Sequence, residues 1–331
     1  MLCDLIIRAF FSVSLGIPFL QSQLLVLKYY PEMRPYLLNE GIPGSDHPRI
    51  LVLGGSAAHT SFCNLDQQIN RDSEGNYFKK FELDTLAQYA QNSLDSWYKY
   101  KLLEKLKFKY IIFYHGINDA RTNNCPKEYF DLDYRHISFY NELFILFRHP
   151  EIKFTMIPWF SDFVIQKFKE KTGLHKTIPK EYNVMEFYFR KTANEDPGWK
   201  YGNELKSKAS FSRNLTNILN LAEKKGDSVL VVSYAWFQPE NYSLQKFIDK
   251  QLGYTEHKWP TELYGSPINV KAGIIAHNVI GKELASNFYV ARAVDFEGTL
   301  PKKGEYFFDI CHLTQAGCEE MGKKIRSNIF P

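Results

Sequence analysis

Short apolar runs alternate with helical patterns along most of the chain, and this alternation restricts the fold more than any other sequence feature. Longer segments of helical period separate the runs. The runs lie at 49–56, 86–91, 110–115, 228–233 and 288–294, and the helical segments at 65–83 in part, 97–107, 211–225 and 270–285. Apolar runs bounded by turn residues are typical of buried parallel strands. The pattern therefore predicts a doubly wound α/β fold with a mainly parallel five-stranded sheet between helices.

The segment 125–208 interrupts this alternation. It is rich in aromatic residues and lysine, has helical patterns at 139–148 and 160–171, and contains no run long enough to join the sheet. We expect a helical insertion over the carboxyl edge of the strands, where such folds bind ligands. The predicted organisation is an N-terminal lead-in over 1–48 and one domain over 49–331, which ends in a helix that Thr314 caps.

The N-terminal segment is largely apolar but interrupted. Arg8 and two glutamines lie within the stretch from Leu5 to Leu27, and Asp4 stands where a signal peptide is usually basic. A helix needs about 20 apolar residues to cross a bilayer. The segment thus predicts either a membrane anchor or a packed amphipathic helix. Localisation stays open, with the cell envelope or a membrane slightly favoured over the cytoplasm.

Charge and cysteine content exclude some classes of function. The 41 basic and 37 acidic residues give a formal charge of +4 without a basic stripe, which argues against nucleic-acid binding. The five cysteines have neither CxxC nor Cys/His spacing, so they predict neither a zinc site nor a disulfide scaffold. Cys311 and Cys318 could form a disulfide, but buried free thiols are the favoured interpretation. We expect no metal or organic cofactor.

The first candidate for chemistry is Gly54-Gly55-Ser56, directly after the first predicted strand. A serine on a tight turn at the carboxyl end of a strand exposes its hydroxyl to the crevice, and small neighbours such as Gly55 let a substrate approach. This arrangement suits a nucleophile. The same residues could instead form a phosphate-binding turn before a helix.

The second candidate is the segment His115-Gly116-Ile117-Asn118-Asp119, after the third predicted strand. The Asn118 amide could donate to the oxygen that becomes negative in a tetrahedral intermediate. Gly116 and Asp119 would support this loop. The alternative is an Asn-Asp turn that only closes the strand.

The third candidate is Asp309-Ile310-Cys311-His312, just before the last predicted helix. A histidine takes a proton from a serine through one ring nitrogen when an acceptor, usually a carboxylate, holds the other. The alternative is an aspartate that caps a turn, beside a solvent-facing histidine.

All three motifs belong to the same carboxyl edge of the predicted sheet, so their side chains should converge. With these motifs the chain resembles the SGNH/GDSL hydrolases over roughly residues 49–329, and 113–124 resembles a subgroup of bacterial, often membrane-tethered members. The resemblance implies a flavodoxin-like α/β/α sandwich. It also implies a triad of Ser56, Asp309 and His312, and an oxyanion hole that includes the Ser56 N–H and Asn118.

Two departures from the family pattern bear on the site. The family's Gly-Asp-Ser is Gly54-Gly55-Ser56 here, which keeps the nucleophile. The family's second block usually has an Asn followed by a glycine whose N–H completes the oxyanion hole, and the corresponding stretch here is Gln91-Asn92-Ser93-Leu94-Asp95-Ser96-Trp97, which contains no glycine. Ser96 fits that position best, and Ser93 is the next choice.

The resemblance implies hydrolysis of a small-molecule or carbohydrate ester through an acyl-enzyme, and by analogy the removal of O-acetyl groups from a carbohydrate. An acyltransferase with the same triad and an inert binding module of the same fold are the alternatives. The aromatic residues of the insertion could line an acyl pocket or stack on a sugar, although a small core of their own is favoured. They are Tyr140, Phe144, Phe147, Trp159, Phe160 and Trp199.

Overall fold

The computed structural model describes residues 2–38, 46–72, 74–175 and 201–329. The chain divides into two compact units. One comprises Gly44–Cys125 and Val184–Pro331 and contains the sheet, and the other comprises Met1–Pro43 and Pro126–Asn183.

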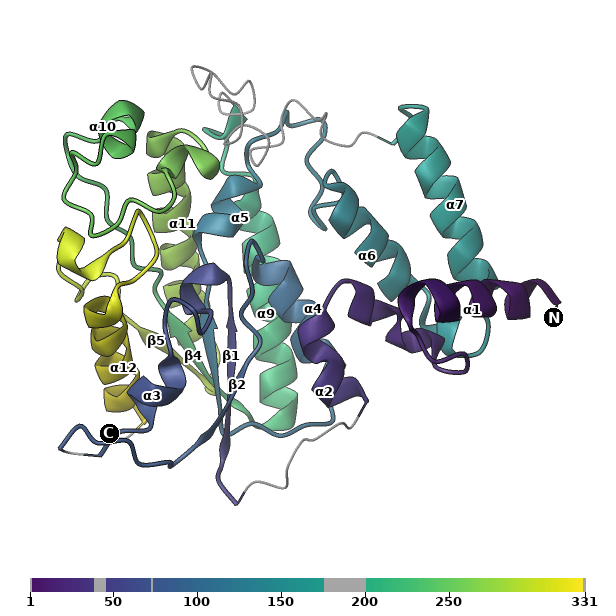
Figure 1. Ribbon diagram of the computed structural model, residues 1–331, viewed down its shortest axis with the longest axis horizontal. Coiled ribbons are helices and arrows are strands. Elements are labelled where there is room, and N and C mark those ends of the chain that lie inside the picture. The colour runs from purple at the N-terminus through teal and green to yellow at the C-terminus, as the bar shows by residue number, and fades with distance from the viewer. Residues whose placement is uncertain (1, 39–45, 73, 176–200, 330–331) are drawn as a thin grey trace. The chain divides into compact units, whose positions relative to one another are not determined.

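A five-stranded parallel sheet forms the centre of the first unit (Figure 1). Its strands pair in the order β2-β1-β3-β4-β5, and all four pairings are parallel. This order is the flavodoxin-like order of a doubly wound fold, so the predicted fold class is confirmed. The strands are β1 (Arg49–Gly54), β2 (Glu82–Thr85), β3 (Tyr110–Tyr114), β4 (Ser228–Val232) and β5 (Ala291–Val294).

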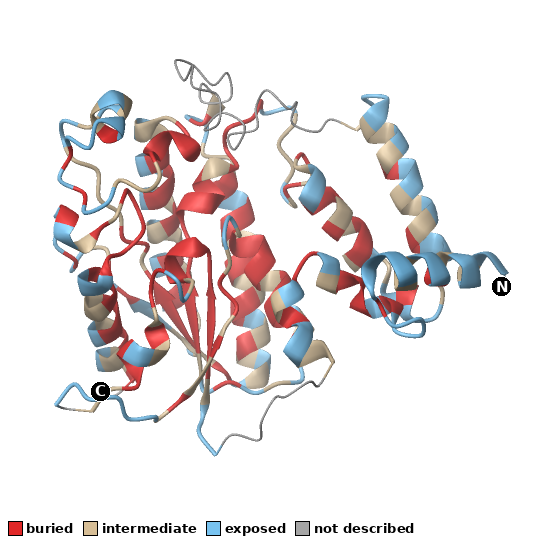
Figure 2. Ribbon diagram, viewed as in Figure 1, coloured by how far each residue is buried: buried red, intermediate tan, exposed pale blue. Residues whose placement is uncertain are grey.

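Helices cover both faces of the sheet (Figure 1), and the strands between them are largely buried (Figure 2). Helices α3 (Leu65–Ile69) and α12 (Gln315–Ile329) pack together on one face. On the other face α9 (Ser207–Lys225) lies between α4 (Ser93–Leu102) and α11 (Pro267–Ser286). Shorter elements follow the strand ends, namely η3 (Ser56–Ala58), α5 (Ile117–Arg121), α10 (Leu244–Ile248), η7 (Thr261–Leu263) and η8 (Gly304–Tyr306).

The second strand lies earlier in the chain than its apolar run predicts. The structure places it at Glu82–Thr85, and 86–91 forms the turn that follows. As an edge strand it pairs only with β1, and Arg49 of β1 forms an ion pair with its Asp84 at 2.5 Å. An edge strand needs no continuous apolar run, which explains why the sequence pattern missed it.

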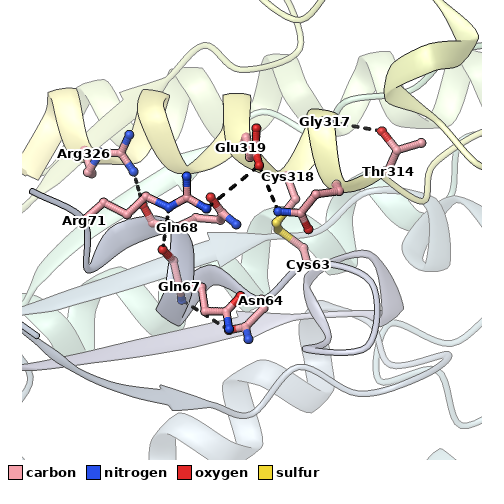
Figure 3. Close-up of a disulfide and its surroundings, with 11 residues drawn as sticks. Cys63, Asn64, Gln67, Gln68, Arg71, Thr314, Gly317, Cys318, Glu319 and Arg326 are labelled. Atoms are coloured by element: carbon pink, nitrogen blue, oxygen red, sulfur yellow. Dashed lines mark hydrogen bonds and ion pairs between the residues drawn. A yellow bond between two sulfur atoms is a disulfide. The ribbon is translucent and has the colours of Figure 1, made fainter. Parts of the chain in front are cut away.

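The cysteine prediction is wrong in one respect. Cys63 forms a disulfide with Cys318 (Figure 3). Cys311 is a buried free thiol, as expected. The two bonded residues are 255 positions apart and meet because α3 and α12 pack against each other. This contact depends on the topology of the sheet, so cysteine spacing could not reveal it.

The second unit combines the N-terminal segment with the insertion. Arg8 of α1 (Leu2–Leu15) donates to the Phe154 carbonyl at 2.8 Å, and Asp4 accepts the Met156 N–H at 2.6 Å. Buried Trp159 and Tyr140 contribute to its core. Its other elements are η1 (Ser22–Lys28), η2 (Pro31–Met33), α2 (Arg34–Leu37), α6 (Ser138–Arg148), η4 (Pro150–Lys153) and α7 (Ile157–Lys171).

Helix α1 exposes most of its apolar side chains (Figure 2). Val13 is 89% exposed and Phe10 is 62% exposed. Within the described residues, no helix combines the length and the apolar character needed to span a membrane. Membrane association and the location of the insertion over the sheet stay predictions. Residues 176–200 of the insertion, which include Trp199, lie outside the described residues.

Candidate active site

Ser56 follows the carboxyl end of strand β1, which lies between β2 and β3 in the sheet. It begins the single turn η3, and its Oγ lies 2.8 Å from Nε2 of His312. Gly54 and Gly55 make this turn possible because it is tightly packed. A Cβ at position 54 would lie 2.7 Å from the Ala58 side chain, and one at position 55 would lie 2.6 Å from Nδ2 of Asn118. The glycines therefore allow other side chains to approach the serine closely.

His312 and Asp309 belong to one tight turn before α12. Nδ1 of His312 lies 2.9 Å from each carboxylate oxygen of Asp309. The same carboxylate accepts the backbone N–H groups of Cys311 and His312 at 3.0 Å. Both side chains are almost completely buried, at 0% exposure for Asp309 and 2% for His312. The turn thus fixes the carboxylate, and the carboxylate fixes the imidazole with Nε2 toward Ser56.

The Asp309 carboxylate makes the His312 imidazole a stronger base. Burial opposes the charge on His312, but the adjacent Asp309 carboxylate outweighs burial and raises the pKa of His312 well above its ordinary value. The Cys311 thiol also contacts the imidazole, with Sγ 3.5 Å from Nδ1 of His312. Burial raises the pKa of the Cys311 thiol.

Asn118 approaches the nucleophile from α5. Its Nδ2 donates to the Gln91 carbonyl at 2.8 Å and lies against the backbone of Gly55. A primary amide has two N–H donors, so one remains for an oxyanion on a substrate bound to Ser56. Ser56 is the first residue of η3. The backbone N–H at the start of such a turn has no hydrogen-bond partner within the turn. The structure therefore brings Ser56, Asn118, Asp309 and His312 together.

The structure does not place Ser96 in this group. Its N–H bonds within α4 to the Asn92 carbonyl at 3.4 Å, and its Oγ lies 2.7 Å from Nε2 of buried His115. Ser93, the second choice, donates its N–H and its hydroxyl to Asp119. Both serines have partners within the fold, and the contribution of the Ser96 N–H to an oxyanion hole stays a prediction, which its bond to the Asn92 carbonyl does not favour.

The segment that lies beside Ser56 is the turn 86–91. A Cβ at Gly55 would lie 3.0 Å from the Gln91 carbonyl oxygen. Ala90 in this turn has a φ of 59°, a left-handed conformation that normally favours glycine. A glycine would have marked the turn in the sequence, and an alanine gives no such signal.

A buried polar network holds the turn 86–91 and the loop after β3. Lys99 donates to the Leu86 carbonyl at 2.6 Å and to the Gln91 side chain. Burial, with a contribution from Lys99, lowers the pKa of His115 to about 3, so this imidazole is neutral. Gly116 provides close packing, since a Cβ there would lie 2.8 Å from the Tyr234 ring.

Three side chains of the triad loop also have the chemistry of metal ligands. The donor atoms of Asp309, Cys311 and His312 lie within 4.8 Å of one another. Nδ1 of His312 and the Asp309 carboxylate are already hydrogen-bonded to each other. The two groups therefore hold each other in place.

Comparisons with known proteins add structural likenesses only. No family model matches the sequence, and no curated protein matches it. A candidate platelet activating factor from Streptococcus pneumonia is 14% identical with a TM-score of 0.47, over 92% of this chain and 95% of the other. A GDSL-like lipase from Bacteroides thetaiotaomicron VPI-5482 is 12% identical with a TM-score of 0.45, over 91% and 98%. A lipase/acylhydrolase from Enterococcus faecalis is 13% identical with a TM-score of 0.41, over 85% and 95%.

The chain resembles the SGNH/GDSL hydrolases. This resemblance rests on the chain's own sheet order and on the side chains of Ser56, Asn118, Asp309 and His312, and not on the solved structures.

Proposed function

We propose that the protein is a serine-dependent carboxylic-ester hydrolase that acts through an acyl-enzyme. The observation that carries this proposal is the continuous chain of contacts from Ser56 through His312 to Asp309, at 2.8 and 2.9 Å. Such a chain matches the distances at which a base can take a proton from a nucleophile and be oriented by a third group. A purely structural serine needs neither partner.

The first half of the reaction forms the acyl-enzyme. Ser56 Oγ attacks the ester carbonyl carbon while its proton passes to Nε2 of His312. Asp309 stabilises the imidazolium, and the Ser56 N–H and the Asn118 amide stabilise the oxyanion. The C–O bond then breaks, and His312 returns the proton to the departing alcohol. The alcohol leaves with Ser56 acylated.

Water completes the cycle. His312 takes a proton from a water molecule whose oxygen attacks the acyl carbon. The second tetrahedral intermediate collapses, the proton passes to Ser56, and the carboxylic acid leaves. For the acyl group we propose acetyl on a carbohydrate alcohol, by analogy with the hydrolases that the chain resembles.

The proposal is tested by steady-state kinetics on acetyl, butyryl and octanoyl esters. We expect hydrolysis by the intact protein and loss of at least about a thousandfold in kcat for Ser56→Ala. Ser286→Ala removes an exposed hydroxyl at the end of α11 and serves as the matched control. Equal rates for Ser56→Ala and the intact protein would refute the proposal. Added sugar acceptors distinguish a transferase, which would form an acylated sugar in place of free acid.

A further inference from the structure

Two aromatic rings contact the imidazole of the triad. The ring centroid of Phe62 lies 4.3 Å from that of His312, and the centroid of Trp259 lies 4.8 Å from it. The two aromatic rings also meet each other edge to face at 5.4 Å. Phe62 belongs to the loop between η3 and α3, and Trp259 to the loop between α10 and η7. Two separate loops thus converge on the general base.

A third aromatic ring extends this surface toward the oxyanion side. Tyr89 meets Phe62 edge to face at 5.9 Å and belongs to the turn 86–91, beside Asn118. Tyr89 is 52% exposed and Trp259 is partly exposed, whereas Phe62 is buried between them. We call Phe62, Tyr89 and Trp259 the aromatic ledge. It extends from the turn 86–91 to His312.

The mechanism determines which part of an ester lies nearest this ledge. His312 must deliver its proton from Nε2 to the oxygen of the departing alcohol, so this alcohol has to lie beside the imidazole. The rings that contact the imidazole therefore border the alcohol and not the acyl group. This step rests on the proposed function.

The polar groups of the ledge indicate what kind of alcohol fits. The Tyr89 hydroxyl lies 2.7 Å from Oγ of Ser61, which lies 2.8 Å from Nδ1 of His59. Hydroxyl and imidazole groups thus line the exposed end of an aromatic surface. A sugar ring has an apolar face that stacks on an aromatic ring and hydroxyl groups at its edge that need polar partners. A simple alkyl chain has no group that could form a hydrogen bond with these polar side chains.

We propose that the aromatic ledge is the subsite for the leaving alcohol and that this alcohol is a sugar ring, held by stacking on Trp259 and Tyr89. The proposal assigns a specificity role to three residues that take no part in bond making. It predicts that shortening the ledge changes the choice among alcohols when the acyl group is kept constant.

The test compares kcat/KM for three acetate esters: methyl 6-O-acetyl-glucopyranoside, ethyl acetate and octyl acetate. We expect Trp259→Ala to lower the ratio of sugar acetate to ethyl acetate on the order of tenfold, because stacked rings contribute energies of this size. Trp259→Phe keeps an aromatic face and should restore most of the ratio. Trp97→Ala, at a partly exposed tryptophan of α4, should leave the ratio unchanged.

Two outcomes would overturn the proposal. Equal losses on all three esters would show that Trp259 only positions His312, and a selective loss on octyl acetate would show an alkyl subsite. Failure of the hydrolase assignment looks different, because ethyl acetate would then not be hydrolysed by the intact protein and Ser56→Ala would change nothing. A circular dichroism melt of each variant separates these results from unfolding.

Discussion

Cys63 and Cys318 form a disulfide between the loop that follows Ser56 and the helix that follows His312 (Figure 3). The nucleophile and its base come from opposite ends of the first unit's sequence, and their side chains meet at 2.8 Å. The disulfide connects the same two segments covalently, seven residues after the serine and six after the histidine. It therefore restricts how far these segments can separate.

Removing this disulfide should destabilise the protein. For Cys63→Ser combined with Cys318→Ser we expect the free energy of unfolding to fall by about 2 to 5 kcal/mol, because the crosslink closes a long loop in the unfolded chain. Thermal melts with and without reductant measure this. Cys3→Ser, at an exposed free cysteine, is the control. A double variant as stable as the control would contradict the expectation.

The disulfide also bears on localisation. Disulfides persist in oxidising compartments and are rare in the cytosol. We expect protein exported to a bacterial periplasm to contain the Cys63–Cys318 bond, and cytosolic protein to contain it to a smaller extent. Mass spectrometry of alkylated peptides from the two preparations measures the difference, and equal oxidation in both would remove this support for a cell-envelope location.

The pH dependence of kcat/KM should follow His312. The neutral imidazole is the base, so the rate rises as pH increases through the pKa of His312, which Asp309 holds well above its ordinary value. Asp309→Asn removes this carboxylate, so we expect the rise to move to lower pH and the maximal rate to fall about 10⁴-fold. A pH–rate profile of both proteins tests this. A rise at the same pH in the variant would argue against the role of Asp309.

Asn118 and Ser96 should behave differently, and this difference tests which of the two contributes to the oxyanion hole. Asn118→Ala should lower kcat about a hundredfold or more with little change in KM, because its amide acts mainly in the transition state. Ser96→Ala should lower the melting temperature, since buried His115 loses a partner, with a much smaller effect on kcat. Equal losses of kcat in the two variants would support the predicted contribution of Ser96 to the oxyanion hole.

The exposed face of α1 gives a test of the predicted membrane association. Asp4 and Arg8 pair with each other at 2.6 Å on the packed side, so the outer face presents Phe10, Val13 and other apolar side chains. We expect the protein to float with phosphatidylcholine vesicles, and Phe10→Ser with Val13→Ser to reduce this binding about tenfold or more. Ile268→Ser on α11 is a control of similar exposure. Vesicle binding that is unchanged in the α1 variant would refute the prediction.

The sequence predicted most accurately the strands that are buried on both sides. Strands β1, β3 and β4 are continuous apolar runs because helices cover both of their faces, and their bounds agree closely with the prediction. Edge strand β2 is polar at Glu82 and Asp84 and escaped the pattern. The Thr314 hydroxyl accepts the Gly317 N–H at 3.3 Å, as expected of an N-cap.

The parts of the site that lie within one short motif could be predicted from the sequence. The parts that depend on an unusual backbone conformation could not. Asp309 and His312 are three residues apart and meet within one turn, so the sequence could place them together. The turn beside Ser56 depends on a left-handed Ala90 and on buried Lys99, and neither leaves a pattern in the sequence. The pairing of Cys63 with Cys318 likewise follows from the packing of two distant helices.

The reaction of Ser56 with a fluorophosphonate probe tests the central claim most directly. An activated serine displaces fluoride from phosphorus, so intact-protein mass spectrometry should show one adduct, and peptide mapping should place it on Ser56. We predict that Ser56→Ala abolishes the adduct and that His312→Ala slows its formation at least about a hundredfold. A folded protein that forms no adduct, or one whose adduct persists in Ser56→Ala, would contradict the account.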